Sequence, residues 1–339
     1  MRTAAVARVL TALVLAACSG DRLTNVARTP SPPERETLQR DILLNNSGSP
    51  AEELTVAAIN DSNVVTGSLT DGSPQVATIW TPPNYNPTAL PLPGDTGTSL
   101  GTRIANDGTV LGKICDSAAQ HCKWVTWKNG TITPVTPQGD ARDICPCDGP
   151  VIVGGLMVGG VQHAVIWTHG KLLDVGMPPG STGAEFVAVD EGFMAGNATG
   201  PGGGTFRWSP QFGFQMLPGA DTALDVNSSG TVLVSNDRVY PLGGPPIAFP
   251  TDFETGNFSM GTALNDSGWV AGVWTLRAVE QLPPPTAGAW KIGTDNVVQV
   301  NAGEGSQGLD INNSDVEIGQ GFVGPGVFVN EGWVLAFLH

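Results

Sequence analysis

Ala263-Leu264-Asn265-Asp266-Ser267-Gly268 is one of seven copies of a short phrase that recurs along this chain of 339 residues. Each copy has an aliphatic residue, here called the anchor, followed by a cluster of Asn, Asp and Ser. The copies succeed one another at intervals of 37 to 47 residues. Self-similarity at such a period is the signature of a repeat architecture, so it decides the fold before any other feature. The seven anchors are Ile59, Ile104, Ile144, Val189, Val226, Leu264 and Ile311.

A residue suited to a positive φ angle follows each anchor. Glycine enters the left-handed region freely, and Asn and Asp are the best substitutes. The third copy carries one extra residue before Gly149, and the fourth lacks one before Gly192. With the polar cluster, this residue predicts a tight hairpin between two strands. In the other five copies it is Asn63, Gly108, Gly230, Gly268 or Asp315. A second glycine usually follows four positions later, as Gly67, Gly112, Gly196, Gly272 or Gly319, whereas the fifth copy has Val234.

A third strand-like run comes next and often ends in tryptophan, as in Ala77-Thr78-Ile79-Trp80. In the sixth copy Trp290 stands two residues earlier than this pattern predicts, which keeps it on the same face of a strand. A turn and a fourth short run complete the unit. Four strands per unit and seven units predict an all-β chain folded as a β-propeller of seven blades over residues 51–339. A β-solenoid is the alternative, but its coils are usually shorter than this period.

The repeated phrase also resembles a known family. The pattern I-N-x-x-G-x-V-x-G, followed by a degenerate form of H-A-F-x-W, is similar to the bacterial extracellular HAF repeat. His163-Ala164-Val165 is the nearest copy of the His-Ala-Phe tripeptide. The resemblance covers about residues 51–339 and implies an exported, often lipid-anchored protein. Its motifs specify a fold and no chemistry.

The N-terminus resembles a bacterial lipoprotein signal. Arg2 and Arg8 precede an apolar run, which ends in Leu15-Ala16-Ala17-Cys18. We expect residues 1–17 to be removed and Cys18 to carry the lipid, although an ordinary signal peptide with a chance cysteine is the alternative. The protein would then be exported and anchored to the cell envelope. In a bacterium with two membranes, Ser19 resembles the signal for sorting to the outer membrane.

Residues 18–50 are interpreted as a lipid-anchored linker, since they include Pro30-Ser31-Pro32-Pro33. The run Leu38 to Leu44 allows a second interpretation, in which it donates a closing strand to the last blade. The sequence leaves both open.

Charge excludes some partners. The chain has 16 Lys and Arg against 31 Asp and Glu, a formal net charge of −15. Binding to nucleic acid is therefore not expected, because neutralising phosphates needs clustered basic residues. An acidic surface also disfavours adsorption to anionic lipid, so membrane attachment would depend on the acylated cysteine.

Four cysteines follow Cys18, and an even number in an exported protein favours disulfides. Cys115 ends one strand-like run and Cys122 opens the next, so a bridge between them is the first choice. Cys145 and Cys147 are further candidates, although a bridge between residues two apart is strained. Four thiols could instead bind zinc, but no paired C-x-x-C spacing is present.

Binding and catalysis have weaker signals. The Asn and Asp clusters could bind Ca²⁺, but turn formation explains them better, because no copy has the carboxylate density of a calcium loop. We predict no cofactor and no metal. Tryptophans in register are expected to pack between blades. Those outside the register are slightly better candidates for stacking on sugars, although core packing is the favoured interpretation for each of them. The in-register residues are Trp80, Trp127, Trp167 and Trp208, and the others are Trp269, Trp274 and Trp333.

The four histidines, His121, His163, His169 and His339, lie beside no acidic cluster. No nucleophile elbow, metalloprotease motif or P-loop is present. The adjacent carboxylates Asp190 and Glu191 are expected to point to opposite faces of a strand.

Two main hypotheses of function follow, and a purely structural surface protein, which predicts no ligand-shaped pocket, is a third possibility. The first is a non-catalytic binding or scaffold module that recognises an envelope protein or polysaccharide. Its specificity would reside in the long loops over residues 82–97, 198–204 and 276–288. The alternative is a glycan-active enzyme with a site over the propeller channel. Convergence of polar residues at one mouth of the channel is the feature that would discriminate the two.

Overall fold

The structure is a computed structural model that describes residues 42–44, 52–71, 74–94, 97–116, 121–145, 150–252, 256–275, 285–299, 305–322 and 330–336. These residues form strands and turns and contain no helix. Accordingly, no membrane-spanning helix is found within these ranges.

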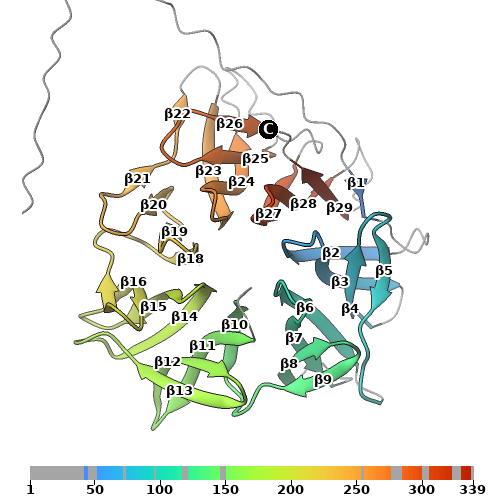
Figure 1. The fold of residues 1–339 in the computed structure, drawn as a ribbon, viewed down its shortest axis with the longest axis horizontal. Coiled ribbons are helices and arrows are strands. Elements are labelled where there is room, and N and C mark those ends of the chain that lie inside the picture. Colours follow the sequence, from blue (N-terminus) through green and yellow to red (C-terminus); the bar gives the residue numbers. More distant parts are fainter. Residues whose placement is uncertain are drawn as a thin grey trace, which may run out of the picture. The chain divides into compact units, whose positions relative to one another are not determined.

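The strands form seven antiparallel sheets arranged as the blades of a ring, with the first strand of each repeat innermost (Figure 1). The seven-bladed β-propeller is thereby confirmed. The first three blades consist of β2 (Glu52–Ile59), β3 (Val65–Asp71), β4 (Val76–Thr81) and β5 (Asn86–Ala89); β6 (Thr98–Ile104), β7 (Val110–Cys115), β8 (Cys122–Lys128) and β9 (Thr131–Pro134); and β10 (Asp140–Ile144), β11 (Val151–Val158), β12 (Val161–Thr168) and β13 (Lys171–Gly176).

Blades 4 to 6 follow in sequence order, and blade 6 has a fifth, short strand. They consist of β14 (Gly183–Asp190), β15 (Phe193–Thr199), β16 (Gly204–Ser209) and β17 (Gly213–Met216); β18 (Ala223–Val226), β19 (Val232–Val234), β20 (Arg238–Tyr240) and β21 (Ile247–Ala248); and β22 (Thr251–Asp252), β23 (Gly256–Leu264), β24 (Trp269–Thr275), β25 (Thr286–Lys291) and β26 (Val297–Gln299).

Blade 7 joins the two ends of the chain. Its first three strands are β27 (Gln307–Ile311), β28 (Val316–Phe322) and β29 (Asn330–Ala336), and its outermost strand is β1 (Ile42–Leu43). Strand β1 pairs antiparallel with β29, with Ile42 opposite Val334 and Leu43 opposite Trp333. Of the two interpretations of the run before residue 44, the structure therefore shows the closing strand, and the propeller includes residues N-terminal to residue 51.

The predicted hairpin turns are present. Asn63, Gly108, Gly230, Gly268 and Asp315 all have positive φ angles, between 56° and 83°. Gly192, in the shortened fourth copy, has φ 92°. Gly149 lies outside the described residues.

Every inner strand carries a β-bulge near its C-terminal end, where the pairing with the second strand skips one residue. The recurrent second glycine lies opposite this irregularity. A Cβ at Gly112 would lie 1.9 Å from the carbonyl oxygen of Leu100, and one at Gly67 would lie 2.0 Å from that of Thr55. The glycine is therefore required by close approach of two backbones and not by its φ angle.

Tryptophans pack between adjacent blades. Trp80 pairs with Val65, Trp127 with Val110 and Trp290 with Val270, which are equivalent positions in three blades. Trp290 is thus in register with the others, and its expected displacement by two residues was wrong. Core packing was favoured over sugar stacking for Trp269, Trp274 and Trp333, and all three are buried.

The Cys115–Cys122 disulfide is confirmed and joins residues that pair directly across β7 and β8. These two thiols are therefore unavailable to zinc. Cys145 is disulfide-bonded as well. Cys147 and Cys18 lie outside the described residues.

Candidate binding site at the mouth of the central channel

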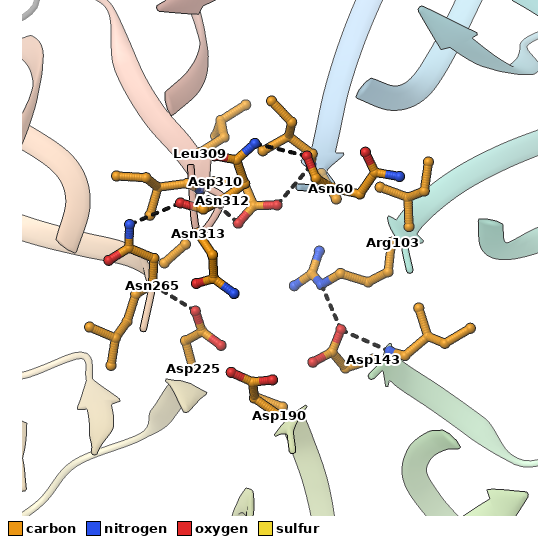
Figure 2. Close-up of a pocket in the computed structure, with 18 of the residues that line it drawn as sticks. Asn60, Arg103, Asp143, Asp190, Asp225, Asn265, Leu309, Asp310, Asn312 and Asn313 are labelled. Atoms are coloured by element: carbon orange, nitrogen blue, oxygen red, sulfur yellow. Dashed lines mark hydrogen bonds and ion pairs between the residues drawn. The ribbon is translucent and has the colours of Figure 1, made fainter. Parts of the chain in front are cut away.

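The C-terminal ends of all seven inner strands meet at one mouth of the central channel and line a cavity of about 120 Å³ (Figure 2). Its lining is polar. Charged side chains come from six of the seven blades, and the turn asparagines surround them. Because each anchor ends or nearly ends its inner strand, the repeated phrase brings the same positions of seven repeats to a single place.

The asparagine that follows the anchor has two functions. Its side-chain oxygen accepts hydrogen bonds from the backbone of its own turn; in Asn312, for example, Oδ1 accepts from the N–H groups of Ser314 and Val316 at 3.0 and 2.9 Å. Its Nδ2 donates to the carbonyl oxygen at the equivalent position of the next blade, a contact we call the clasp. The four clasps run from Asn227 to Asn265 (3.1 Å), Asn265 to Asn312 (2.9 Å), Asn312 to Asn60 (2.8 Å) and Asn60 to Ala105 (3.1 Å).

The residue before the anchor is aspartate in three blades, and it joins neighbouring inner strands. Asp143 accepts from the N–H of its own neighbour Ile144 and from that of Val189 in blade 4, both at 2.9 Å. The bulge directs this side chain towards the channel. The same pair of bonds connects blade 5 to blade 6 through Asp225 and blade 7 to blade 1 through Asp310.

Arg103 holds the equivalent position in blade 2 and supplies the positive charge of the mouth. Its Nε lies 3.3 Å from Asp143 Oδ1, and its side chain is 43% exposed. Burial alone would lower the pKa of Arg103, but Asp143, Asp310 and Asp225 together raise it. The guanidinium is therefore held charged by three carboxylates that face it.

One arginine does not neutralise all of these acids. Burial raises the pKa of Asp310 to about 6, even though Arg103 opposes the shift. Burial also raises the pKa of Asp225 to about 8, and there the negative charges of Asp143 and Asp310 add to the effect. The mouth therefore has more acidic than basic side chains, and the imbalance is greatest on the side of Asp225.

Three of the seven residues that follow an anchor are not asparagine, namely Ala105, Cys145 and Asp190, and Asp190 is the one with an acidic side chain. It occupies the clasp position of blade 4, but a carboxylate cannot donate as the Asn side chain does. Its residue exposure is 8%, and its Oδ1 has no hydrogen-bond partner in the described part of the chain. Burial raises its pKa to about 9, and the carboxyl of Asp266, which hydrogen bonds to it, adds to the shift. In Figure 2 its carboxyl group points into the cavity beside Asp225.

Most residues proposed from the sequence lie elsewhere. The range 82–97 is partly the outer strand β5, and 198–204 is mainly the turn between β15 and β16, so these are parts of blades more than binding loops. Residues 276–284 lie outside the described ranges. His121 and His163 contact Asp116 and Asp174 at exposed positions.

The sequence interpretation did not identify Arg103, Asp143, Asp225 or Asp310 as site residues, and it set Asp190 aside. One signal was available for Asp190, because it stands where four other copies have asparagine. No comparable signal identified the aspartates before the anchors, which alternate with alanine and arginine.

Comparison with solved structures supports the fold alone. The β-propeller domain of the Trilobed protease from Pyrococcus furiosus, described as having an open Velcro topology, aligns with a TM-score of 0.54 and 11% identity over 84% of this chain and 95% of its own. A prolyl endopeptidase (TM-score 0.53, 12% identity, 85% of this chain) and an acylaminoacyl peptidase (0.52, 11%, 84%) are also similar. This chain spans about half the length of each of those two enzymes: 50% and 51%. The sequence matches no protein-family model, and no curated protein is significantly similar to it.

Proposed function

We propose that this protein is an exported, lipid-anchored β-propeller that acts as a non-catalytic binding module at the cell envelope, with its ligand site at the mouth of the central channel. The observation that carries the proposal is the convergence of Arg103, Asp190 and three further aspartates on one cavity. Most of these groups have structural partners, but Asp190 Oδ1 is buried and has none in the described chain. We therefore assign the ligand site to this cavity and not to the long loops, because the cavity is the better-defined site.

Export and anchoring rest on the sequence. Leu15-Ala16-Ala17-Cys18 supports acylation of Cys18, and the resemblance to HAF repeats supports an extracytoplasmic location. The partner would be an envelope protein or a polysaccharide.

The experiment is a pull-down from envelope extract, with the full-length protein held in mild detergent as bait. Three baits are compared: the unchanged protein, Asp190→Asn and the matched control Asp295→Asn, which removes an exposed charge from a turn of blade 6. We expect a partner that the first and third baits retain and Asp190→Asn does not. Equal retention by all three would show that the channel mouth is not the site, and a folded bait that retains nothing would count against a binding module.

A second candidate is the glycan-active enzyme. It is favoured by one observation: the Asp190 carboxyl is kept protonated at neutral pH beside a second carboxyl, that of Asp266. Glycosidases commonly use a carboxylic acid together with a carboxylate. Release of reducing sugar from envelope polysaccharide, abolished in Asp190→Asn but not in Asp295→Asn, would establish this alternative over the first.

A further inference from the structure

Asp190 stands at a position where four of the seven repeats have asparagine. The equivalents in blades 1, 5, 6 and 7 are asparagines that close a clasp to the next blade. Asp190 cannot form that clasp. Its carboxyl group is buried, and Oδ1 has no hydrogen-bond partner in the described chain. Residues that break a repeat at a cost in stability, and that lie in a cavity, are those expected to serve a ligand.

The charges around Asp190 indicate the sign of that ligand. Asp225 and Asp266 are the acids beside it, Glu191 follows it in the turn, and all three raise its pKa. Arg103, the one Lys or Arg among the described residues that line the mouth, forms its ion pair with Asp143, away from Asp190. In Figure 2 the guanidinium and the Asp190 carboxyl lie on different sides of the cavity. Asp190 therefore has no counter-charge beside it among the described residues, whereas Arg103 acts on Asp225 from a distance.

We propose that this side of the channel mouth binds a protonated primary amine, with the ammonium group donating to the carboxylates of Asp190 and Asp225. The inference rests on the proposed function and names the chemistry of its ligand. It applies equally to a lysine side chain of a protein partner and to an amino sugar of a polysaccharide.

Size and ligand geometry favour an ammonium group. The cavity of about 120 Å³ is somewhat smaller than an engineered cavity of roughly 150 Å³ that admits benzene. A short alkylammonium fills such a space, and a longer chain can extend out of the mouth. A metal ion is disfavoured, because the described residues contain no group of three or more His, Cys, Asp or Glu placed to hold one.

Binding of this kind is coupled to proton release. With a pKa of about 9, Asp190 is protonated at neutral pH and must ionise to hold a cation. Asp225, with a pKa of about 8, is also largely protonated at neutral pH and must likewise ionise. The charged groups that face this pair are Asp266, Glu191, Asp143, Asp310 and Arg103. Affinity should therefore rise with pH, by up to about tenfold per pH unit for each proton released.

The test is calorimetric titration of the full-length protein in mild detergent with propylammonium at pH 6, 7 and 8. Buffers of different ionisation enthalpy report the protons released. Because a four-atom ligand binds weakly, we expect a dissociation constant on the order of 1 mM at pH 8. Affinity should be weaker at lower pH, and at least one proton should be released per ammonium bound.

The variants are Asp190→Asn and the control Asp295→Asn. Asp190→Asn should reduce affinity at least tenfold at pH 8 and flatten the pH dependence. It should also raise the melting temperature, because asparagine can close the clasp to the carbonyl of Asn227. Asp295→Asn should bind as the unchanged protein does.

Propionate and Ca²⁺ complete the design. Preferential binding of either one, absence of propylammonium binding, or unchanged binding by Asp190→Asn would each overturn the amine proposal. The pull-down keeps the two proposals distinct. If propylammonium fails to bind while retention of an envelope partner still depends on Asp190, the ligand class is wrong and the binding module stands.

Discussion

Glu317 is the residue whose replacement should stabilise this protein most. It lies on β28 of blade 7 and is fully buried, and neither of its carboxyl oxygens makes a regular hydrogen bond within the described chain. In each blade this position pairs with the anchor residue of the inner strand. In the other six blades the residue at this position is apolar. Those six residues are Val65, Val110, Ile152, Met194, Val232 and Val270.

The expected magnitude comes from two contributions. Burying an uncharged polar group without a hydrogen bond costs about 1–3 kcal/mol in protein mutational data. Ionisation adds to this, because burial raises the pKa of Glu317 well above its ordinary value of 4.5, and the nearby Gly272 N–H opposes the shift only weakly. Folding therefore favours the protonated form, and stability falls as the pH rises above 4.5. The loss is about 1.4 kcal/mol per pH unit for as long as the folded protein keeps the proton.

Glu317→Val should consequently stabilise the protein by about 1–3 kcal/mol near pH 4.5, and by more at pH 8. The assay is denaturant unfolding of both proteins at pH 5 and pH 8. Other buried acids give the unchanged protein a similar trend, so the informative quantity is the difference between the two proteins at each pH. Glu317→Gln separates the contributions: it should remove the added pH dependence but keep an unpaired polar group.

Two results would refute this reasoning. One is a Glu317→Val protein that is less stable than the original at both pH values, which would mean that the carboxyl has a stabilising partner. The other is an equal difference at pH 5 and pH 8, which would mean that Glu317 is ionised in the folded state.

Three further predictions concern the turn asparagines, the Cys115–Cys122 disulfide and the lipid attachment at Cys18. Asn312→Ala removes the clasp to Asn60 and two turn hydrogen bonds, so unfolding should require about 2–4 kcal/mol less, whereas Asn296→Ala in an exposed turn should change little. Equal denaturant midpoints for these two variants would contradict the clasp. Reduction of Cys115–Cys122, or its replacement by two serines, should lower stability by about 2–3 kcal/mol, given the sequence separation of 7 residues, and reductant should have no further effect on the double serine variant. Cys18→Ser should move the protein from the membrane fraction to the soluble fraction; if it stays in the membrane fraction, lipidation of Cys18 is wrong.

The fold could be predicted because each repeat carries the sequence signals of its own strands and turns. The positive φ angles at Asn63 and Asp315 follow from local turn chemistry, which the sequence carries at each position. The Cys115–Cys122 bridge was likewise predictable, because both cysteines border one hairpin.

The site could not be predicted in the same way. Asp143, Asp225 and Asp310 lie in different repeats, and only the ring closure makes them neighbours of Arg103. Asp190 was set aside because it and Glu191 were expected to alternate along a strand, whereas β14 ends at Asp190 and Glu191 begins the turn with a φ angle of 34°. The asparagines were assigned to turns alone, because their second bond is to another blade and has no trace in local sequence.

The pairing of β1 with β29 has a consequence for the order in which the protein can fold. Blades 1 to 6 are made from consecutive stretches of chain, so each can form as soon as its own residues are available. Blade 7 is different, because its last strand comes from the beginning of the chain. Contacts such as that between Ile59 N–H and Asp310, 251 residues apart, must wait for the C-terminal repeat. Non-local contacts of this kind slow folding, and the edge of blade 1 stays uncovered until they form. A chain that emerges from a ribosome or a translocation pore beginning with its N-terminus therefore completes the ring last, at the junction where its first and last strands meet.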